Sequence, residues 1–287
     1  SNELMLSDPA GFSHVAASNT FGPYVFGDNQ YIVLQDHASA TIEMWKSTDA
    51  GVTWNEVDAA NHPSCKPDAG ITEDDGPYGF QAYSSTTDPR LTGIIYICYI
   101  DPTGPLRVKS FNTNSDTWGT ALTGGPDFND PTVTRFGQSS APYAIMMIDF
   151  LQSLEKLRIT FTGPRQLGFF IGPGGGIFNP QRVNFVDVSL GGTWDPIKNL
   201  FGYPQMGITY AAPVSFTVNV AGVTRTHVFA TLQNHDADAS VFGIVHVSIS
   251  AAGVLGTEQI LFNWASSVPF VDDSFVSYAA PAVDPRT

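Results

Sequence analysis

Basic residues are scarce in this chain of 287 residues, where 13 Lys and Arg stand against 27 Asp and Glu and the net charge is −14. Charged residues of both signs make up 14% of the chain, against a usual share of about 25%. A chain this acidic is repelled by the phosphates of nucleic acids and by anionic lipid. We therefore expect neither nucleic acid nor a membrane surface as a partner.

Long hydrophobic runs and cysteines are also few. The longest apolar run, residues 93–100, falls far short of the roughly 20 residues that a membrane-spanning helix needs, so we predict no membrane insertion. The two cysteines, Cys65 and Cys98, show no metal-binding spacing. Cys98 lies in an apolar run that is typical of a buried, inert thiol. Whether the two are bonded to each other is left open.

Helical periodicity is almost absent, with residues 150–158 as the best short candidate for a helix. Short runs rich in Val, Ile, Tyr, Phe and Thr instead alternate with Gly, Pro, Asn and Asp at intervals of about 8–12 residues. This spacing predicts an all-β fold.

The short runs recur in a fixed order. Runs that end in an acidic residue lie at 31–36, 96–101, 143–149 and 229–236, and each precedes a second run, at 41–47, 106–111, 157–162 and 243–250. A turn then leads to Trp54, Trp118, Trp194 or Glu258. We assign these as the second, third and fourth strands of a repeated unit, with a short first strand before each.

Repeated four-stranded units predict a β-propeller of antiparallel blades, because one blade cannot bury both of its faces alone. We expect about five or six blades in a single domain over residues 1–287. The longer third unit places an insertion around residues 163–182. Whether the chain is part of a longer protein is left open.

Residues 47–54 carry a specific motif, Ser-x-Asp-x-Gly-x-Thr-Trp. On this motif the sequence resembles the Asp-box (bacterial neuraminidase repeat) β-propellers, with degenerate copies at 111–119 and 189–194. The resemblance implies a structural role for the motif residues, which are Ser47, Asp49, Gly51, Thr53 and Trp54. Asp49 would accept hydrogen bonds from turn amides, Gly51 would adopt a positive φ, and Trp54 would pack between blades.

The resemblance also places this motif between the third and fourth strands, away from the ligand-binding face. The opposite face would carry the second-to-third-strand loops and the connections between blades. Candidate ligand-binding residues there are Asp36, His37, Asp75, Tyr78, Asp101, Asp130, Asp149, His235 and Asp236. The alternative is that these acids only start turns. No cofactor is required; if a cation binds there, oxygen ligands favour Ca²⁺.

Sialidase activity is disfavoured, because the chain lacks the Arg-Ile-Pro motif of sialidases. The acidic residues expected on the ligand-binding face would also repel the anionic substrate of these enzymes. We predict a non-catalytic recognition or scaffold module that binds a glycan or another neutral polyol. We expect it outside the cell or on a cell or virion surface.

Two alternatives stay open, and so does the oligomeric state. One is an exo-acting glycoside hydrolase for a neutral sugar, with its acid and base drawn from Asp36, Asp101, Asp149, Asp236 and Glu73. The other is a structural assembly protein, for example of a virion.

Overall fold

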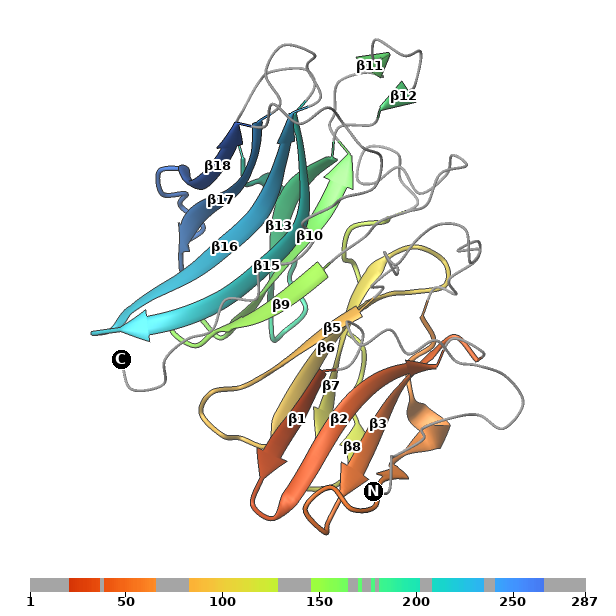
Figure 1. Cartoon of the computed structure of the whole chain (residues 1–287). Helices are drawn as coiled ribbons and strands as arrows, with labels where there is room; N and C mark the ends of the chain where they lie inside the picture. The colour runs from red at the N-terminus through yellow and green to blue at the C-terminus, as the bar shows by residue number, and fades with distance from the viewer. Residues whose placement is uncertain are drawn as a thin grey trace. The chain divides into compact units, whose positions relative to one another are not determined.

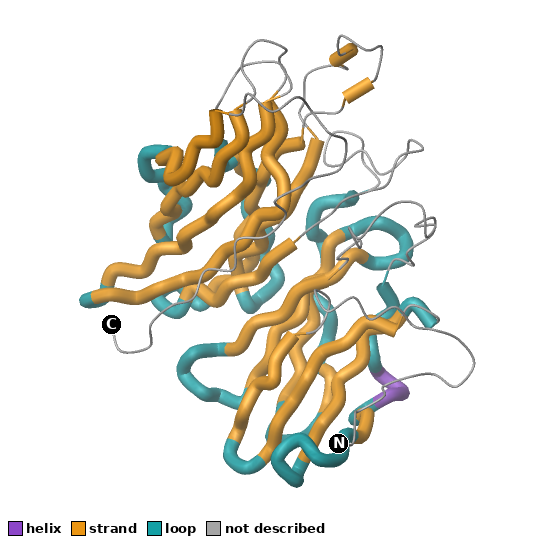
Figure 2. The backbone as a smooth tube through the Cα atoms, in the orientation of Figure 1, coloured by secondary structure: helices purple, strands orange, loops and turns teal. Residues whose placement is uncertain are grey.

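The structure is a computed structural model that describes residues 21–36, 39–65, 83–128, 146–164, 170–171, 177–178, 181–201, 208–234 and 241–265. Within these ranges the chain forms β-strands joined by turns, with one short 3-10 helix at Ala59–Asn61 (Figures 1 and 2). In the same ranges no helix is long and apolar enough to span a bilayer.

Among the described residues, four sheets have four strands each, and in each of these sheets the strands pair antiparallel in chain order (Figure 1). The first contains β1 (Phe21–Phe26), β2 (Asn29–Asp36), β3 (Thr41–Ser47) and β4 (Asn55–Glu56). The second contains β5 (Tyr83–Thr87), β6 (Ile94–Ile100), β7 (Leu106–Asn112) and β8 (Thr117–Trp118).

The third sheet contains β9 (Met146–Leu151), β10 (Lys156–Pro164), β13 (Gln181–Ser189) and β14 (Lys198–Asn199). Between β10 and β13, β11 (Phe170–Ile171) and β12 (Ile177–Phe178) form a separate two-stranded sheet. The fourth sheet contains β15 (Ile208–Val220), β16 (Val223–Asn234), β17 (Val241–Ser250) and β18 (Gln259–Ala265).

The predicted fold class is confirmed: the described part of the chain is all-β and forms four-stranded antiparallel blades of the propeller type, together with the two-stranded sheet of β11 and β12. The inner strands explain why the sequence pattern is readable, because β2 and β6 are apolar runs that are buried on both faces. The number of blades and their closure into one domain stay predictions.

The third sheet corrects the strand assignment. Residues 143–149 were expected to be its second strand, but β9 is its first strand and continues to Leu151. The second and third strands are β10 and β13, so residues 165–180 connect the second strand to the third. The helix candidate at 150–158 contains the turn between β9 and β10. The acidic residue was misleading because Asp149 lies inside a strand rather than at its end.

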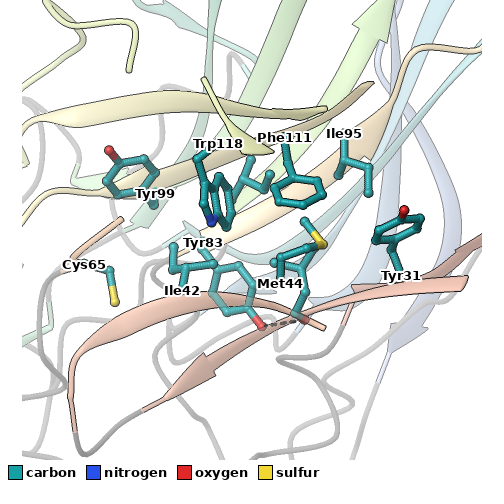
Figure 3. Close-up of a cluster of buried hydrophobic side chains, with 11 residues drawn as sticks. Tyr31, Ile42, Met44, Cys65, Tyr83, Ile95, Tyr99, Phe111 and Trp118 are labelled. Carbon is teal, nitrogen blue, oxygen red and sulfur yellow. Dashed lines mark hydrogen bonds between the residues drawn. The ribbon is translucent and has the colours of Figure 1, made fainter. Parts of the chain in front are cut away.

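The chain divides into two compact units, one with the first two sheets and the other with the third and fourth. In the first unit, alternate side chains of β2 and β3 pack against the second sheet (Figure 3). This core consists of Tyr31, Val33, Ile42, Met44, Cys65, Tyr83, Ile95, Ile97, Tyr99, Phe111 and Trp118. Cys65 and Cys98 are both buried, and they form no disulfide with each other.

The second unit has its own core between the third and fourth sheets, with Phe185, Phe201 and Val245 among its members. A fully buried arginine, Arg158 of β10, lies within this unit. Its Nε and Nη2 atoms donate to the two carboxylate oxygens of Asp187 at 2.7 Å each. It also donates to the carbonyl of Ser250 at 3.0 Å, so one side chain links the two sheets.

Candidate functional site

Each blade has two ends with different connections. In an antiparallel meander the first-to-second and third-to-fourth turns lie at one end, which we call the turn end. The second-to-third connection lies at the other end, which we call the loop end. In the first sheet the turn end contains residues 27–28 and 48–54, and at the loop end β2 finishes at Asp36 and β3 begins at Thr41.

The turn end of the first sheet is closed by the side chains of residues 47–54. Asp49 accepts hydrogen bonds from the backbone N of Thr53 at 2.8 Å, from Thr53 Oγ1 at 2.6 Å and from Ser47 Oγ at 2.8 Å. Ser47 Oγ accepts from the backbone N of Gly51 at 2.8 Å, and Gly51 has a φ of 87°. Trp54 is half-buried, and its indole N donates to the carbonyl of Gly51. All of these hydrogen bonds join residues of the motif to one another, so the motif stabilises its own turn.

The third-to-fourth-strand turn of the fourth sheet uses part of the same arrangement, whereas the acidic residue of the corresponding turn in the second sheet bonds to the first sheet. Asp116 accepts from Tyr31 Oη at 2.8 Å and from Lys46 Nζ at 2.6 Å, so it bonds to the first sheet. In the fourth sheet Ser250 Oγ accepts from the backbone N of Val254 at 3.0 Å, and Gly253 has a φ of 77°. The sequence predicted a turn before Glu258 but no copy of the motif there, because residues 250–258 contain neither Asp nor Trp.

We expect Asp49→Ala to destabilise the protein at neutral pH, with a difference from wild type that shrinks in acid. Hydrogen bonds from the side chain and then the backbone of Thr53 lower the pKa of Asp49 to about 2. Its stabilising contribution is therefore present above its ordinary pKa and is lost as the pH falls towards 2. Thermal denaturation at pH 7 and pH 2.5 measures this, with the exposed neighbour Thr48→Ala as the control. An equal difference at both pH values would contradict it.

Two of the candidate carboxylates, Asp36 and Asp101, lie at the loop ends of their sheets. Asp36 is the last residue of β2 and accepts from Ser39 Oγ at 2.5 Å. Asp101 follows β6, and it accepts from the backbone N of Thr103 at 3.0 Å and from Arg107 Nε at 2.6 Å. Both acids therefore help to hold their own connections.

Asp101 and Arg107 also form a partly exposed ion pair, with 19% and 25% of their side chains accessible. Tyr99 and Arg107 are cross-strand partners, and Asp101 lies two residues beyond Tyr99, so the three share one face of the sheet. Burial raises the pKa of Asp101, but hydrogen bonds from Thr103 and Arg107 outweigh this and lower it below its usual value. The carboxylate is therefore held ionised beside a guanidinium.

Asp149 is not a loop-end residue. It is buried inside β9, where it accepts a hydrogen bond from Ser215 Oγ, and burial raises its pKa to about 6. The other candidates lie outside the described residues: His37, Glu73, Asp75, Tyr78, Asp130, His235 and Asp236.

A cluster that sequence analysis missed lies on the first sheet. One ligand atom each of Glu43, Glu56 and His62 lies within 4.8 Å of the other two. His62 Nδ1 is 3.2 Å from Glu56 Oε1, and the indole N of Trp45 donates to Glu43 Oε2 at 2.7 Å. Glu43 lies between Ile42 and Met44 along β3, and because both of these are core residues, Glu43 faces away from the core.

The charges around Glu43 oppose its ionisation. Burial raises its pKa most, and the negative charges of Glu56 and Asp36 raise it further, while the Trp45 hydrogen bond and His62 lower it. Along the sequence, Glu56 follows Glu43 by 13 residues, and His62 follows Glu56 by six. That spacing matches no motif that sequence analysis considered.

No model of a known protein family matches the chain, and no curated protein matches it in sequence. An α-L-arabinanase from Penicillium chrysogenum, complexed with arabinobiose, is a similar solved structure with 11% identity and a TM-score of 0.46. That alignment covers 79% of this chain and 62% of that chain. The GH93 α-L-arabinofuranosidase of Fusarium graminearum, with arabinobiose, has 12% identity and a TM-score of 0.46, covering 80% of this chain and 61% of that one.

The BP39L lectin from Burkholderia pseudomallei has 14% identity and a TM-score of 0.44, and the alignment covers 83% of this chain and 53% of that chain. The chain thus spans less than two thirds of the length of each of these three structures. Likeness at this level identifies neither a family nor a function. Membership of the Asp-box family stays a prediction.

Proposed function

We propose that the chain is a non-catalytic β-propeller recognition module that binds a glycan or another neutral polyol at the loop ends of its blades. The observation that carries the proposal is the partly exposed Asp101–Arg107 pair, which lies at a loop end beside Tyr99. The setting we propose is extracellular, or on a cell or virion surface.

The pair has the chemistry that sugar hydroxyls need. An ionised carboxylate accepts hydrogen bonds from hydroxyls, and a guanidinium donates them. The bonds from Thr103 and Arg107 already fix the Asp101 carboxylate, so little side-chain freedom is lost on binding. The Asp101–Arg107 pair, like Asp49 and Asp116 at the turn end, is bonded within the protein. It also offers a ligand an acceptor and a donor side by side at a partly exposed position, which favours the loop end as the surface for a ligand.

The charge state of Asp101 favours recognition over catalysis. A general acid in glycoside hydrolysis needs a raised pKa, whereas the pKa of Asp101 is lowered. Asp149 does have a raised pKa, but it is buried inside β9. Neither Asp101 nor Asp149 therefore combines a raised pKa with an accessible position.

We expect Asp101→Asn to weaken glycan binding by about tenfold, the usual loss when one charged hydrogen bond is replaced by a neutral one. A glycan array with the wild-type chain identifies a ligand, and titration calorimetry with that ligand measures the loss. Asp28→Asn, an exposed aspartate at the turn end of the first sheet, is the matched control and should bind as wild type does.

The same preparations are tested for release of reducing sugar from the bound glycan. Hydrolysis that Asp101→Asn abolishes would replace the proposal with the glycoside hydrolase alternative. Equal binding by wild type and Asp101→Asn, with loss in Asp28→Asn, would place the ligand at the turn end and overturn it.

A further inference from the structure

The Glu43–Glu56–His62 cluster brings together three metal-ligating side chains from different segments of the first sheet. Glu43 lies on β3, Glu56 on β4, and His62 directly after the 3-10 helix. All three side chains are partly buried, and their ligand atoms lie within 4.8 Å of one another. The set is of mixed chemistry, with one imidazole nitrogen and two carboxylates.

The spacing of the His62 and Glu56 ligand atoms suits a small ion with short bonds. A tetrahedral ion with bonds of about 2.0–2.1 Å keeps its ligand atoms roughly 3.3 Å apart. His62 Nδ1 and Glu56 Oε1 already lie 3.2 Å apart. The Trp45 indole, which is not one of the three ligands, holds Glu43 Oε2 at 2.7 Å and leaves the other carboxylate oxygen for the ion.

The electrostatics of the cluster also favour a cation. Glu43 is partly buried, and one ligand atom each of Glu56 and His62 lies within 4.8 Å of its carboxylate. Two carboxylates drawn together in this way repel each other, and a divalent ion reverses the sign of that interaction. The cluster therefore carries an electrostatic cost that a bound cation would remove.

We propose that Glu43, Glu56 and His62 bind a single divalent ion of the zinc type. The imidazole decides the class of metal, because Ca²⁺ and Mg²⁺ take oxygen ligands, whereas Zn²⁺ accepts a mixed set of nitrogen and carboxylate ligands. Three protein ligands leave a fourth position for water. The ion would join the two-residue strand β4 and the segment after it to β3. It would therefore stabilise the edge of the first sheet.

Titration calorimetry with Zn²⁺ alone, on the full chain after treatment with a chelator, tests the proposal. We expect one site that is lost, or weakened at least tenfold, in both Glu43→Gln and His62→Gln. Zn²⁺ should raise the melting temperature of the wild type and not that of either variant, because an ion that binds the folded state stabilises it. Ca²⁺ should produce no comparable shift.

Two features keep the test decisive. Glu43→Gln relieves the charge repulsion, so the metal-free variant should be at least as stable as the wild type while it loses the Zn²⁺ response. His246→Gln is the matched control, since His227 and His246 form the other described histidine contact, at 2.9 Å. An unchanged Zn²⁺ response in Glu43→Gln or His62→Gln, or a response that disappears in His246→Gln, would overturn the proposal.

Discussion

Arg158→Met is expected to lower the free energy of unfolding by about 3–5 kcal/mol, the usual result of removing one partner of a buried ion pair. The variant leaves the carboxylate of Asp187 buried without its guanidinium. It also removes the hydrogen bonds to the carbonyls of Ser250 and Ala251 and to Thr226 Oγ1, which join β10 to the fourth sheet.

The same unit provides a matched control. Lys156 on β10 forms an ion pair with Asp195 at 2.7 Å, with side-chain accessibilities of 28% and 39%. Because water screens such a pair, Lys156→Met should cost no more than about 1 kcal/mol. Urea denaturation of both variants gives the comparison. Equal costs, or a cost below about 1 kcal/mol for Arg158→Met, would show that the buried network does not hold the two sheets together.

Asp149→Asn is expected to remove a pH dependence of stability between about pH 4 and pH 7. Burial raises the pKa of Asp149 from its ordinary 3.8 to about 6, and the bonds from Ser215 and the charge of Arg158 reduce that rise only in part. A difference of this size corresponds to about 3 kcal/mol between the protonated and ionised forms in the fold.

The sign follows from which state binds the proton. The folded chain holds a proton on Asp149 that the unfolded chain releases near pH 4, so this group stabilises the fold fully below pH 4. The contribution is lost as the pH rises through about 6. At pH 7.5 the wild type carries a buried charge that the Asp149→Asn variant lacks, so the variant should lose less stability than the wild type as the pH rises.

Urea denaturation of wild type and Asp149→Asn at pH 5 and pH 7.5 measures this difference. The change in stability between the two pH values is the readout, because a new contact of the amide would shift both values together. Parallel pH profiles for the two proteins would contradict the prediction. Glu155→Gln, in the exposed turn that follows β9, is the control and should leave the wild-type profile unchanged.

Most strands of the first, second and fourth sheets could be predicted, because their inner strands are apolar runs bounded by turn residues. The wrong strand assignment in the third sheet has one cause. An acidic residue was expected to end a strand, but Asp149 lies buried within β9, where Ser215 donates a hydrogen bond to it and the charge of Arg158 acts on it. Sequence alone does not distinguish a buried aspartate that has tertiary partners from a solvated one that starts a loop.

Some features of the candidate site could also be predicted from the sequence, and others could not. Asp36 and Asp101 could be placed at the loop end because each directly ends a recognisable strand. The pairing of Asp101 with Arg107 depends on the β6–β7 register, and the Glu43–Glu56–His62 cluster depends on a bend of the chain after β4. Contacts of this kind arise from backbone geometry, and no residue pattern records them.

The connection between β10 and β13 has a practical meaning for engineering. Residues 165–180 carry an additional strand pair at the loop end, where the first sheet uses only residues 37–40, yet β10 and β13 keep continuous antiparallel pairing from Lys156 to Pro164. The blade therefore accepts a long insertion there without a break in its ladder. Foreign peptides intended for display belong at these connections, and the 48–54 turn, whose side chains are bonded to its own backbone, is the place to leave intact.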